Sequence, residues 1–198
     1  MRSICSHQIP LNRKANSIET TKRTASVSIR NNTSNPIVSI SLIHKYSDVY
    51  KHRKEWAAIP ASDSSTESLK VEYNTGFFTT GRDWWFISWY SQDMKTLYYS
   101  NPQNFRGAFD AIEKGIAVIS GGPVLVVLAT LATVAVAKAT TNRLYEMEET
   151  AGFKQHILRE EDEGKVTEII INEDETITFK SQSGDSETVY TSKTAPGQ

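Results

Sequence analysis

A run without any charged residue interrupts this otherwise polar chain and restricts how the chain can fold. It extends from Gly115 to Ala137 and is bounded by Lys114 and Lys138. As one continuous helix, with a rise of about 1.5 Å per residue, it would be about 34 Å long, which is enough to cross the hydrocarbon core of a bilayer. The residues on both sides of it have the alternation of β-strands. A single crossing would separate those strands by a membrane, so they could not share one sheet.

The composition of the run predicts two helices with a tight joint. About half of its residues are Gly, Ala, Ser, Thr or Pro, so that insertion into a bilayer would be marginal. Gly121, Gly122 and Pro123 interrupt a helix, and proline is favoured at the first position of a new one. We therefore expect a helical hairpin over about 102–145, with arms from about 102 to 120 and from 123 to about 145. A hairpin returns the chain to its starting side, which removes the conflict in topology.

The second arm of this hairpin predicts a contact surface. Between Val124 and Ala137 the helix would have no charged face, and a helix that is apolar all round must be buried in protein or in lipid. Ala129, Thr133 and Ala137 are four residues apart and form a stripe of small side chains, which allows close packing of the first arm or of another helix. The residues expected to contact a membrane or a partner are Val124, Val127, Leu128, Leu131 and Val134.

The remainder of the chain predicts a mainly β domain of the α+β class. Ala25, Val27 and Ile29 alternate with polar residues, and a similar alternation follows over 38–43 after a turn. Further segments with strand character are 68–74, 84–91, 95–100, 153–159, 166–172, 176–181 and 188–192. About eight or nine short strands with frequent turns predict a β-sandwich, with the helical hairpin inserted between its two halves.

Length and composition indicate one domain with two tails. Residues 1–24 and 192–198 are expected to be disordered tails, and residues 25–191 to form the domain. The formal net charge is −1 and the isoelectric point is about 6.4, so no nucleic-acid partner is expected. The first 24 residues contain no apolar segment typical of a secretory signal. An intracellular location, either cytoplasmic or membrane-associated, is therefore expected.

A cluster of aromatic residues is one candidate for a contact surface. Trp84, Trp85 and Trp89 fall within one predicted strand, with Trp84 on one face and the other two on the opposite face. One face is expected in the core. The other face is either buried as well, as in a central strand, or exposed to lipid headgroups, sugars or a protein partner.

A basic and aromatic patch is a second candidate. It consists of Lys51, Arg53, Lys54 and Trp56. Such a patch suits anionic lipid headgroups or a nucleic-acid backbone, although charge runs of this kind are usually solvated loops.

The sequence contains no recognisable catalytic or metal-binding motif. The histidines are His7, His44, His52 and His156, and none has a partner at a spacing typical of metal ligands. Glycine-rich phosphate loops, a nucleophile elbow and the HExxH pattern are all missing. We therefore identify no metal, no cofactor and no small-molecule substrate, and we expect that the protein is not an enzyme.

Four segments resemble a known family. They are HKYSDVYKHRKEW over 44–56, NTGFFTTGRDWWFISWY over 74–90, NFRGAFD over 104–110 and GFKQHILREED over 152–162. They are similar to a fungal and nematode family whose nematode members are named as domains up-regulated in long-lived insulin-pathway mutants. GRDWWFISWY is the most specific part, and the resemblance extends from about Ala25 to Thr191. It implies a small β-sandwich-type domain and brings no established activity, cofactor or catalytic residue.

Two hypotheses follow for a non-enzymatic protein. In the first, a β-sandwich protein engages membranes through its apolar helical hairpin, with help from the basic and aromatic patch. In the second, the protein is a soluble interaction module whose hairpin is buried by homo-oligomerisation or by a partner. The expected partner is thus either membrane lipid or a second protein chain.

Overall fold

The computed structural model describes residues 20–47, 49–76, 79, 82–101 and 130–195. Within these ranges the chain is mainly β, as the sequence predicts. The strands are β1 (Thr21–Asn32), β2 (Ile37–Tyr46), β3 (Tyr50–Ile59), β4 (Leu69–Thr75), β5 (Asp83–Ser91), β6 (Thr96–Ser100), β7 (Lys154–Gln155), β8 (Val166–Asn172), β9 (Thr176–Ser181) and β10 (Gly184–Thr194). The helix α2 (Thr130–Glu146) lies between β6 and β7 in the chain, and a short 3-10 helix, η1 (Glu160–Asp162), precedes β8.

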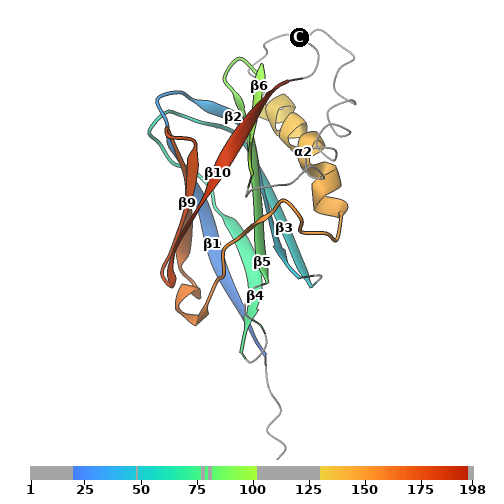
Figure 1. Ribbon diagram of the computed structural model, residues 1–198, viewed down its shortest axis with the longest axis vertical. Coiled ribbons are helices and arrows are strands. Elements are labelled where there is room, and N and C mark those ends of the chain that lie inside the picture. Colours follow the sequence, from blue (N-terminus) through green and yellow to red (C-terminus); the bar gives the residue numbers. More distant parts are fainter. Residues whose placement is uncertain (1–19, 48, 77–78, 80–81, 102–129, 196–198) are drawn as a thin grey trace, which may run out of the picture.

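The strands form one sheet that is nearly closed into a barrel (Figure 1). Their order is β3-β2-β5-β6-β10-β9-β8-β1-β4, and β7 pairs with β5 beside this path. Strands β1 and β8 are parallel, with Ser26 opposite Val166, and the other pairs are antiparallel. The end strands β3 and β4 meet through side chains, because the Tyr50 hydroxyl donates to Asn74 Oδ1 at 3.4 Å and His52 Nε2 lies 3.9 Å from the Glu72 carboxylate. Just before β4, the Glu67 carbonyl accepts from Trp56 Nε1 at 2.9 Å.

The predicted β-sandwich is therefore corrected to a single curled sheet. The reason is the last strand, which is longer than the expected segment 188–192. Strand β10 pairs with β9 from Gly184 to Val189 and with β6 from Tyr190 to Thr194, so it joins the two halves into one sheet. A sandwich of two separate sheets has no such shared strand.

The interior of the curled sheet is an apolar core. The predicted alternation in β1 is confirmed, because Ala25, Val27 and Ile29 all point into this core and are buried. Large side chains from the opposite wall, including Trp85 and Phe179, fill the space between the strands. Each such side chain contributes about 1.5–3 kcal/mol through burial alone.

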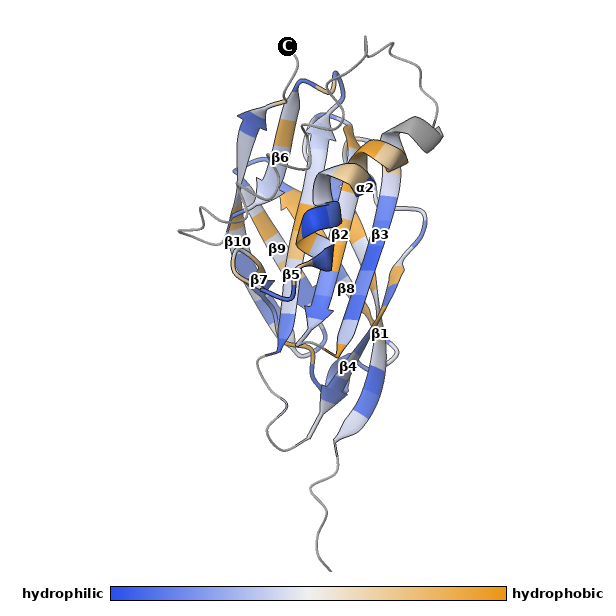
Figure 2. Cartoon of the chain, turned by 90° about the vertical axis from the view of Figure 1, so that its right-hand side faces the viewer, coloured by the Kyte–Doolittle hydropathy of each residue, from blue (hydrophilic) through white to orange (hydrophobic). Residues whose placement is uncertain are grey.

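The helix α2 packs on the outer face of the sheet, over β2, β3 and β5 (Figure 2). It covers a second apolar cluster, built around Phe86 and Tyr90 of β5 and Leu144 of the helix. Two pairs of hydroxyl groups join the helix to the sheet. Thr141 Oγ1 lies 2.8 Å from Ser41 Oγ, and Thr140 Oγ1 lies 3.0 Å from the Tyr90 hydroxyl. The sheet thus carries one core on its inner face and another on its outer face.

The predicted helical hairpin is not supported. Among the described residues α2 is the only α-helix, and both the expected first arm and residues 123–129 of the second arm lie outside them. The helix ends at Glu146, next to the expected end at Tyr145. No helix in the described part of the chain is long and apolar enough to cross a membrane. The part of α2 from Ala137 onward is instead amphipathic, with Lys138 and Arg143 exposed on the side away from the sheet.

A buried lysine from β2 holds the C-terminal end of α2. Lys45 is completely buried, and its Nζ donates to the carbonyl groups of Leu144 at 2.6 Å, Met147 at 2.5 Å and Glu149 at 3.2 Å. It also lies 4.6 Å from the centre of the Phe153 ring. The last carbonyl groups of a helix have no partner within the helix and carry partial negative charge, so an ammonium group stabilises them. Burial lowers the pKa of Lys45 to about 8.

Candidate functional site

A pocket of about 500 Å³ opens at one end of the sheet. The β1–β2 loop, the β5–β6 turn and the β8–β9 turn meet there, together with residues of β5, β6 and β10. Its volume lies within the range of small-molecule binding sites. The lining combines three aromatic rings, two carboxylates and several uncharged polar side chains.

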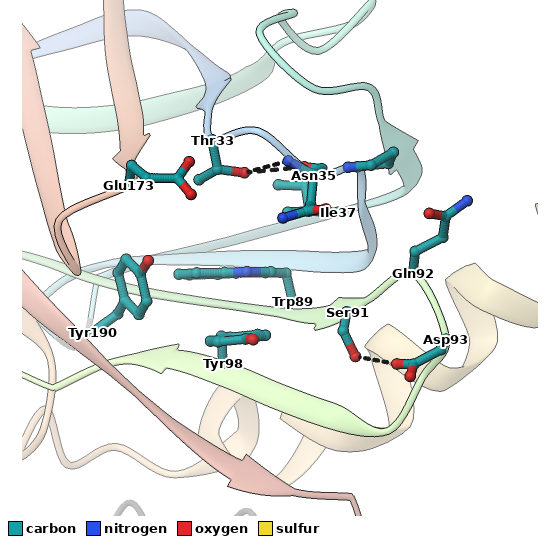
Figure 3. Close-up of a pocket in the computed structure, with 11 residues that line it drawn as sticks. Thr33, Asn35, Ile37, Trp89, Ser91, Gln92, Asp93, Tyr98, Glu173 and Tyr190 are labelled. Carbon is teal, nitrogen blue, oxygen red and sulfur yellow. Dashed lines mark hydrogen bonds between the residues drawn. The ribbon is translucent and has the colours of Figure 1, made fainter.

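The three rings come from strands that are neighbours in the sheet (Figure 3). Trp89 of β5 is paired in register with Tyr98 of β6, and their rings are stacked at 5.6 Å with an angle of 8° between the planes. Tyr190 of β10 stands nearly perpendicular to both, with its ring 5.0 Å from Trp89 and 5.9 Å from Tyr98. The rings therefore form a corner, in which Trp89 and Tyr190 are the two sides.

The β1–β2 loop on the opposite side of the pocket is held in shape by a buried asparagine. Asn31 Nδ2 donates to the carbonyl groups of Asn35 at 2.8 Å and Pro60 at 2.9 Å, and its Oδ1 accepts from the Thr33 hydroxyl at 2.8 Å. Asparagine side chains commonly stabilise turns through such bonds to nearby backbone groups. Thr33 and Asn35, which line the pocket, are thus fixed before any ligand binds.

The two carboxylates lie in different turns. Glu173 of the β8–β9 turn accepts hydrogen bonds from the backbone N–H of Ser34 at 2.7 Å and from its hydroxyl at 3.0 Å. Asp93 of the β5–β6 turn accepts from the Ser91 hydroxyl at 2.6 Å and from the Lys95 N–H at 3.0 Å. The hydrogen bond from Ser91 lowers the pKa of Asp93, so this carboxylate is ionised at neutral pH.

The potential at the Tyr190 side of the pocket is negative. Burial raises the pKa of Tyr190, and the nearby carboxylates Glu175, Glu173 and Asp174 raise it further. None of the described residues that line the pocket is Lys, Arg or His. The arrangement can accept hydrogen bonds and stabilise a positive charge beside aromatic rings.

The apolar residues that the sequence predicted as a contact surface are only partly described. Val124, Val127 and Leu128 lie outside the described residues. Leu131 belongs to α2, and Val134, one turn later on the same helix, is half-buried. Their contact with a membrane or a partner stays a prediction.

The residues of the basic and aromatic patch lie on strand β3, whose alternation distributes them over both faces. Trp56 is buried in the inner core, and Lys54 lies 5.7 Å from the centre of its ring. Arg53 lies on the face that α2 covers, 4.4 Å from the Tyr145 ring. Lys51 precedes it by two residues and is half-buried. The structure therefore does not bring these four side chains together on one surface.

The three tryptophans of β5 follow the predicted alternation. Trp84 packs against the outer cluster and is half-buried, whereas Trp85 and Trp89 belong to the inner core. Trp85 Nε1 donates to the His156 carbonyl at 2.9 Å. Of the alternatives left by the sequence, burial on both faces is the one observed. Trp89 is the member of the cluster that also lines the pocket.

The described histidines lie away from this pocket. His44 and Asp83 are buried side by side, with 2.9 Å between His44 Nε2 and Asp83 Oδ1. His52 Nδ1 lies 3.3 Å from His44 Nδ1, and burial lowers the pKa of His52 to about 4. His156 Nδ1 lies 2.8 Å from the Ser186 hydroxyl. No group of metal-ligating side chains occurs among the residues that the structure describes.

The pocket as a whole was not predicted from the sequence. Its lining residues come from segments as far apart as Thr33 and Tyr190, and no local spacing connects them. The signals that could have suggested it are the aromatic residues of three strands, together with turns rich in Asn, Asp and Glu.

Comparison with known proteins tests the resemblance noted in the sequence. No curated protein matches the chain. A family model described as "Up-Regulated in long-lived daf-2" matches residues 21–190, from the start of β1 into β10. This range includes the pocket and both apolar clusters apart from Ala195, and it confirms the suspected family. The chain therefore belongs to the family of proteins up-regulated in long-lived daf-2.

Proposed function

We propose that this protein is a non-enzymatic binding protein and that the pocket at the end of the sheet is its ligand site. The observation that carries the proposal is the combination, in one cavity of about 500 Å³, of three aromatic rings with polar loop residues held by their own hydrogen bonds. Binding sites for small molecules usually have this form, with apolar walls and a few positioned polar groups. A preformed site of this kind also avoids the entropic cost of ordering loops on binding.

The nature of the lining supports binding without catalysis. Its described lining residues include no His, Cys or Lys, which are frequent nucleophiles and general bases, and the Ser91 hydroxyl and the two carboxylates are engaged in hydrogen bonds that hold their loops. The buried pair His44 and Asp83 lies in the sheet interior, where a substrate would have to displace core side chains. Both observations favour a protein that recognises a ligand and does not transform it.

The test is a binding screen with a matched pair of variants. Small molecules of several classes, including ammonium compounds, monosaccharides, amino acids and nucleotides, are offered to the wild type in a thermal-shift assay. Tyr190→Leu removes one wall of the pocket, and Tyr145→Leu removes a tyrosine ring on the helix, away from the pocket. We expect a class that stabilises the wild type and Tyr145→Leu but not Tyr190→Leu. If every class fails, or if Tyr190→Leu responds like the wild type, the proposal is wrong.

A second candidate function is contact with a membrane or a partner protein through the apolar residues that precede and begin α2. The observation that favours it is the charge-free run from Gly115 to Ala137. Its test is flotation of the purified protein with anionic and neutral liposomes, combined with light scattering to measure its oligomeric state. Flotation would support membrane contact, and a soluble oligomer that never floats would support a protein interface instead. A monomer that never floats would refute both.

A further inference from the structure

The shape of the aromatic corner restricts what can occupy the pocket. The Trp89 ring stacks on Tyr98 with one face, and in Figure 3 its other face is directed toward Thr33, Asn35 and Ile37. Tyr190 is inclined to Trp89 by 75°, with 5.0 Å between the ring centres. Trp89 is only 3% exposed, so it offers no broad platform for a flat sugar ring. A compact, rounded group fits such a corner better, because it rests mainly on Tyr190 and needs little of the Trp89 surface.

The charges of the lining residues determine whether a positively or a negatively charged ligand is favoured. Within the described part of the chain, Glu173 and Asp93 are the two carboxylic acids of the lining, and no basic side chain belongs to it. Lys95 interacts with Asp93, but its side chain is exposed beside the turn and does not line the pocket. Glu175 and Asp174 add further negative charge near Tyr190. Phosphate and carboxylate ligands are therefore disfavoured, and a cation is favoured.

The remaining choice is between a primary ammonium and a substituted one. A primary ammonium has three N–H donors that need acceptors around one point, whereas the two carboxylates lie in different turns and are already held, Glu173 by Ser34 of the β1–β2 loop and Asp93 by Ser91 and Lys95. A quaternary ammonium has no N–H group and spreads its charge over methyl groups, which pack well on the faces of aromatic rings. Its positive charge still benefits from carboxylates that it does not touch directly.

From these three steps we infer that the pocket binds a quaternary ammonium group of the choline type. The inference rests on the proposed function of the pocket as a ligand site. The methyl groups pack mainly on Tyr190, which is partly exposed, and reach only the small accessible part of Trp89, while Glu173 supplies compensating charge from the loop side. The rest of the ligand extends toward the open side of the pocket, so the same group is recognised in free choline and in a choline lipid headgroup.

Calorimetric titration of the purified full-length protein tests the role of charge. The probes are choline and its neutral carbon isostere dimethylbutanol, which has the same shape without the positive charge. We expect choline to bind about tenfold more tightly than dimethylbutanol, because only the cation is attracted by the rings and carboxylates. Equal affinity of the two probes, or no binding of choline, would overturn the inference.

Variants test the residues. Tyr190→Phe keeps the ring and should bind choline like the wild type, whereas Tyr190→Leu should weaken binding about tenfold. Glu173→Gln should weaken it about threefold, and Glu187→Gln, the same change on an exposed residue of β10 outside the lining, should not. Circular dichroism and the melting temperature of each variant show that it is folded. If folded Tyr190→Leu and Glu173→Gln bind choline like the wild type, the site is not this pocket.

Further measurements distinguish a lipid headgroup from a free ligand. They also distinguish a failure of the ammonium inference from a failure of the proposed function. Flotation with phosphatidylcholine vesicles, compared with phosphatidylglycerol vesicles, shows whether the group is recognised on a lipid or only in free form. If choline fails while another compound binds in a way that depends on Tyr190, the pocket remains a ligand site and only the ammonium inference is wrong. If no compound binds, both proposals are wrong.

Discussion

Replacing Lys45 by methionine is expected to loosen the attachment of α2 to the sheet. The substitution keeps a long, unbranched side chain in the same space and removes the ammonium group that binds three carbonyl groups at the helix end. Those carbonyls then have no partner from the sheet. The cation that lies over the Phe153 ring is lost as well.

The expected loss of stability depends on how deeply the three carbonyl acceptors of Lys45 are buried. The Leu144 carbonyl is bonded at a buried position, and leaving a buried acceptor unpaired costs about 1–3 kcal/mol. The Met147 and Glu149 carbonyls are part-buried, so water can replace the ammonium there at a smaller cost. Methionine also avoids the desolvation of a buried charge, which offsets some of the loss. We expect a net decrease of about 2 kcal/mol in the free energy of unfolding.

Urea unfolding followed by far-ultraviolet circular dichroism measures this decrease, and hydrogen exchange of the α2 amides shows where it originates. The matched control is Lys51→Met, because Lys51 is paired in register with Lys45 and has the same side chain. Lys51 also repels the Lys45 charge, so its removal should leave stability unchanged or slightly higher. A Lys45→Met protein as stable as the wild type would show that desolvation of the charge outweighs its hydrogen bonds, which would refute the reasoning.

The pH dependence of stability provides an independent measure of the same group. The pKa of Lys45 is about 8 in the folded protein, whereas the ordinary value is 10.5, so the unfolded chain holds more protons between these values. The free energy of unfolding therefore rises with pH in this window, and Glu146 and Glu149, which raise the pKa of Lys45, limit the effect. In Lys45→Met the titrating group is missing, so the free energy of unfolding of this variant does not gain this increase with pH. The stability gap between wild type and variant should widen as the pH is raised from below 8 toward 10.

Three further predictions concern other parts of the fold. Asn31→Leu should lower the free energy of unfolding by about 2–3 kcal/mol in urea titrations, because its buried amide fixes the β1–β2 loop, whereas exposed Asn32→Leu should cost little. Burial lowers the pKa of His52 and His156 to about 4, so the unfolded chain binds more protons below pH 6.5 and melting temperatures should fall from there toward pH 4. If the apolar run contacts lipid, Leu131→Asp should abolish liposome flotation while circular dichroism stays native.

The sequence predicted local structure well where one face of an element is buried. The period-two pattern of Ala25, Val27 and Ile29 identified β1, because only the inner face of that strand is apolar. Strand β3 was missed, since its charged residues resemble a solvated loop. In the structure Arg53 is paired with Glu55 at 2.8 Å and lies against the Tyr145 ring, so the charges are satisfied beneath α2. Glu55 lies beside Arg53 only because the extended strand places residues two apart on the same face, and Tyr145 is distant in sequence.

The sequence also did not predict that one strand connects the two halves of the sheet. The segment Gly184–Thr188 contains Asp185, Ser186 and Glu187, which have low strand propensity, so the expected strand began only at residue 188. Pairing with β9 overrides this propensity, because the backbone ladder and buried Thr188 compensate for it. The longer strand changes the predicted sandwich into one curled sheet.

The position of the pocket follows from how far the inner core extends along β5. Trp85, Ile87 and Trp89 succeed one another on the inner face of this strand, and the first two are completely enclosed by core side chains. Trp89 lies two residues before the last residue of the strand, where the facing wall is a polar loop in place of another apolar strand. Its ring is held on one side by Tyr98 and borders a cavity on the other. The pocket is thus the unfilled end of the interior, and its walls are kept in place by the packing that stabilises the fold.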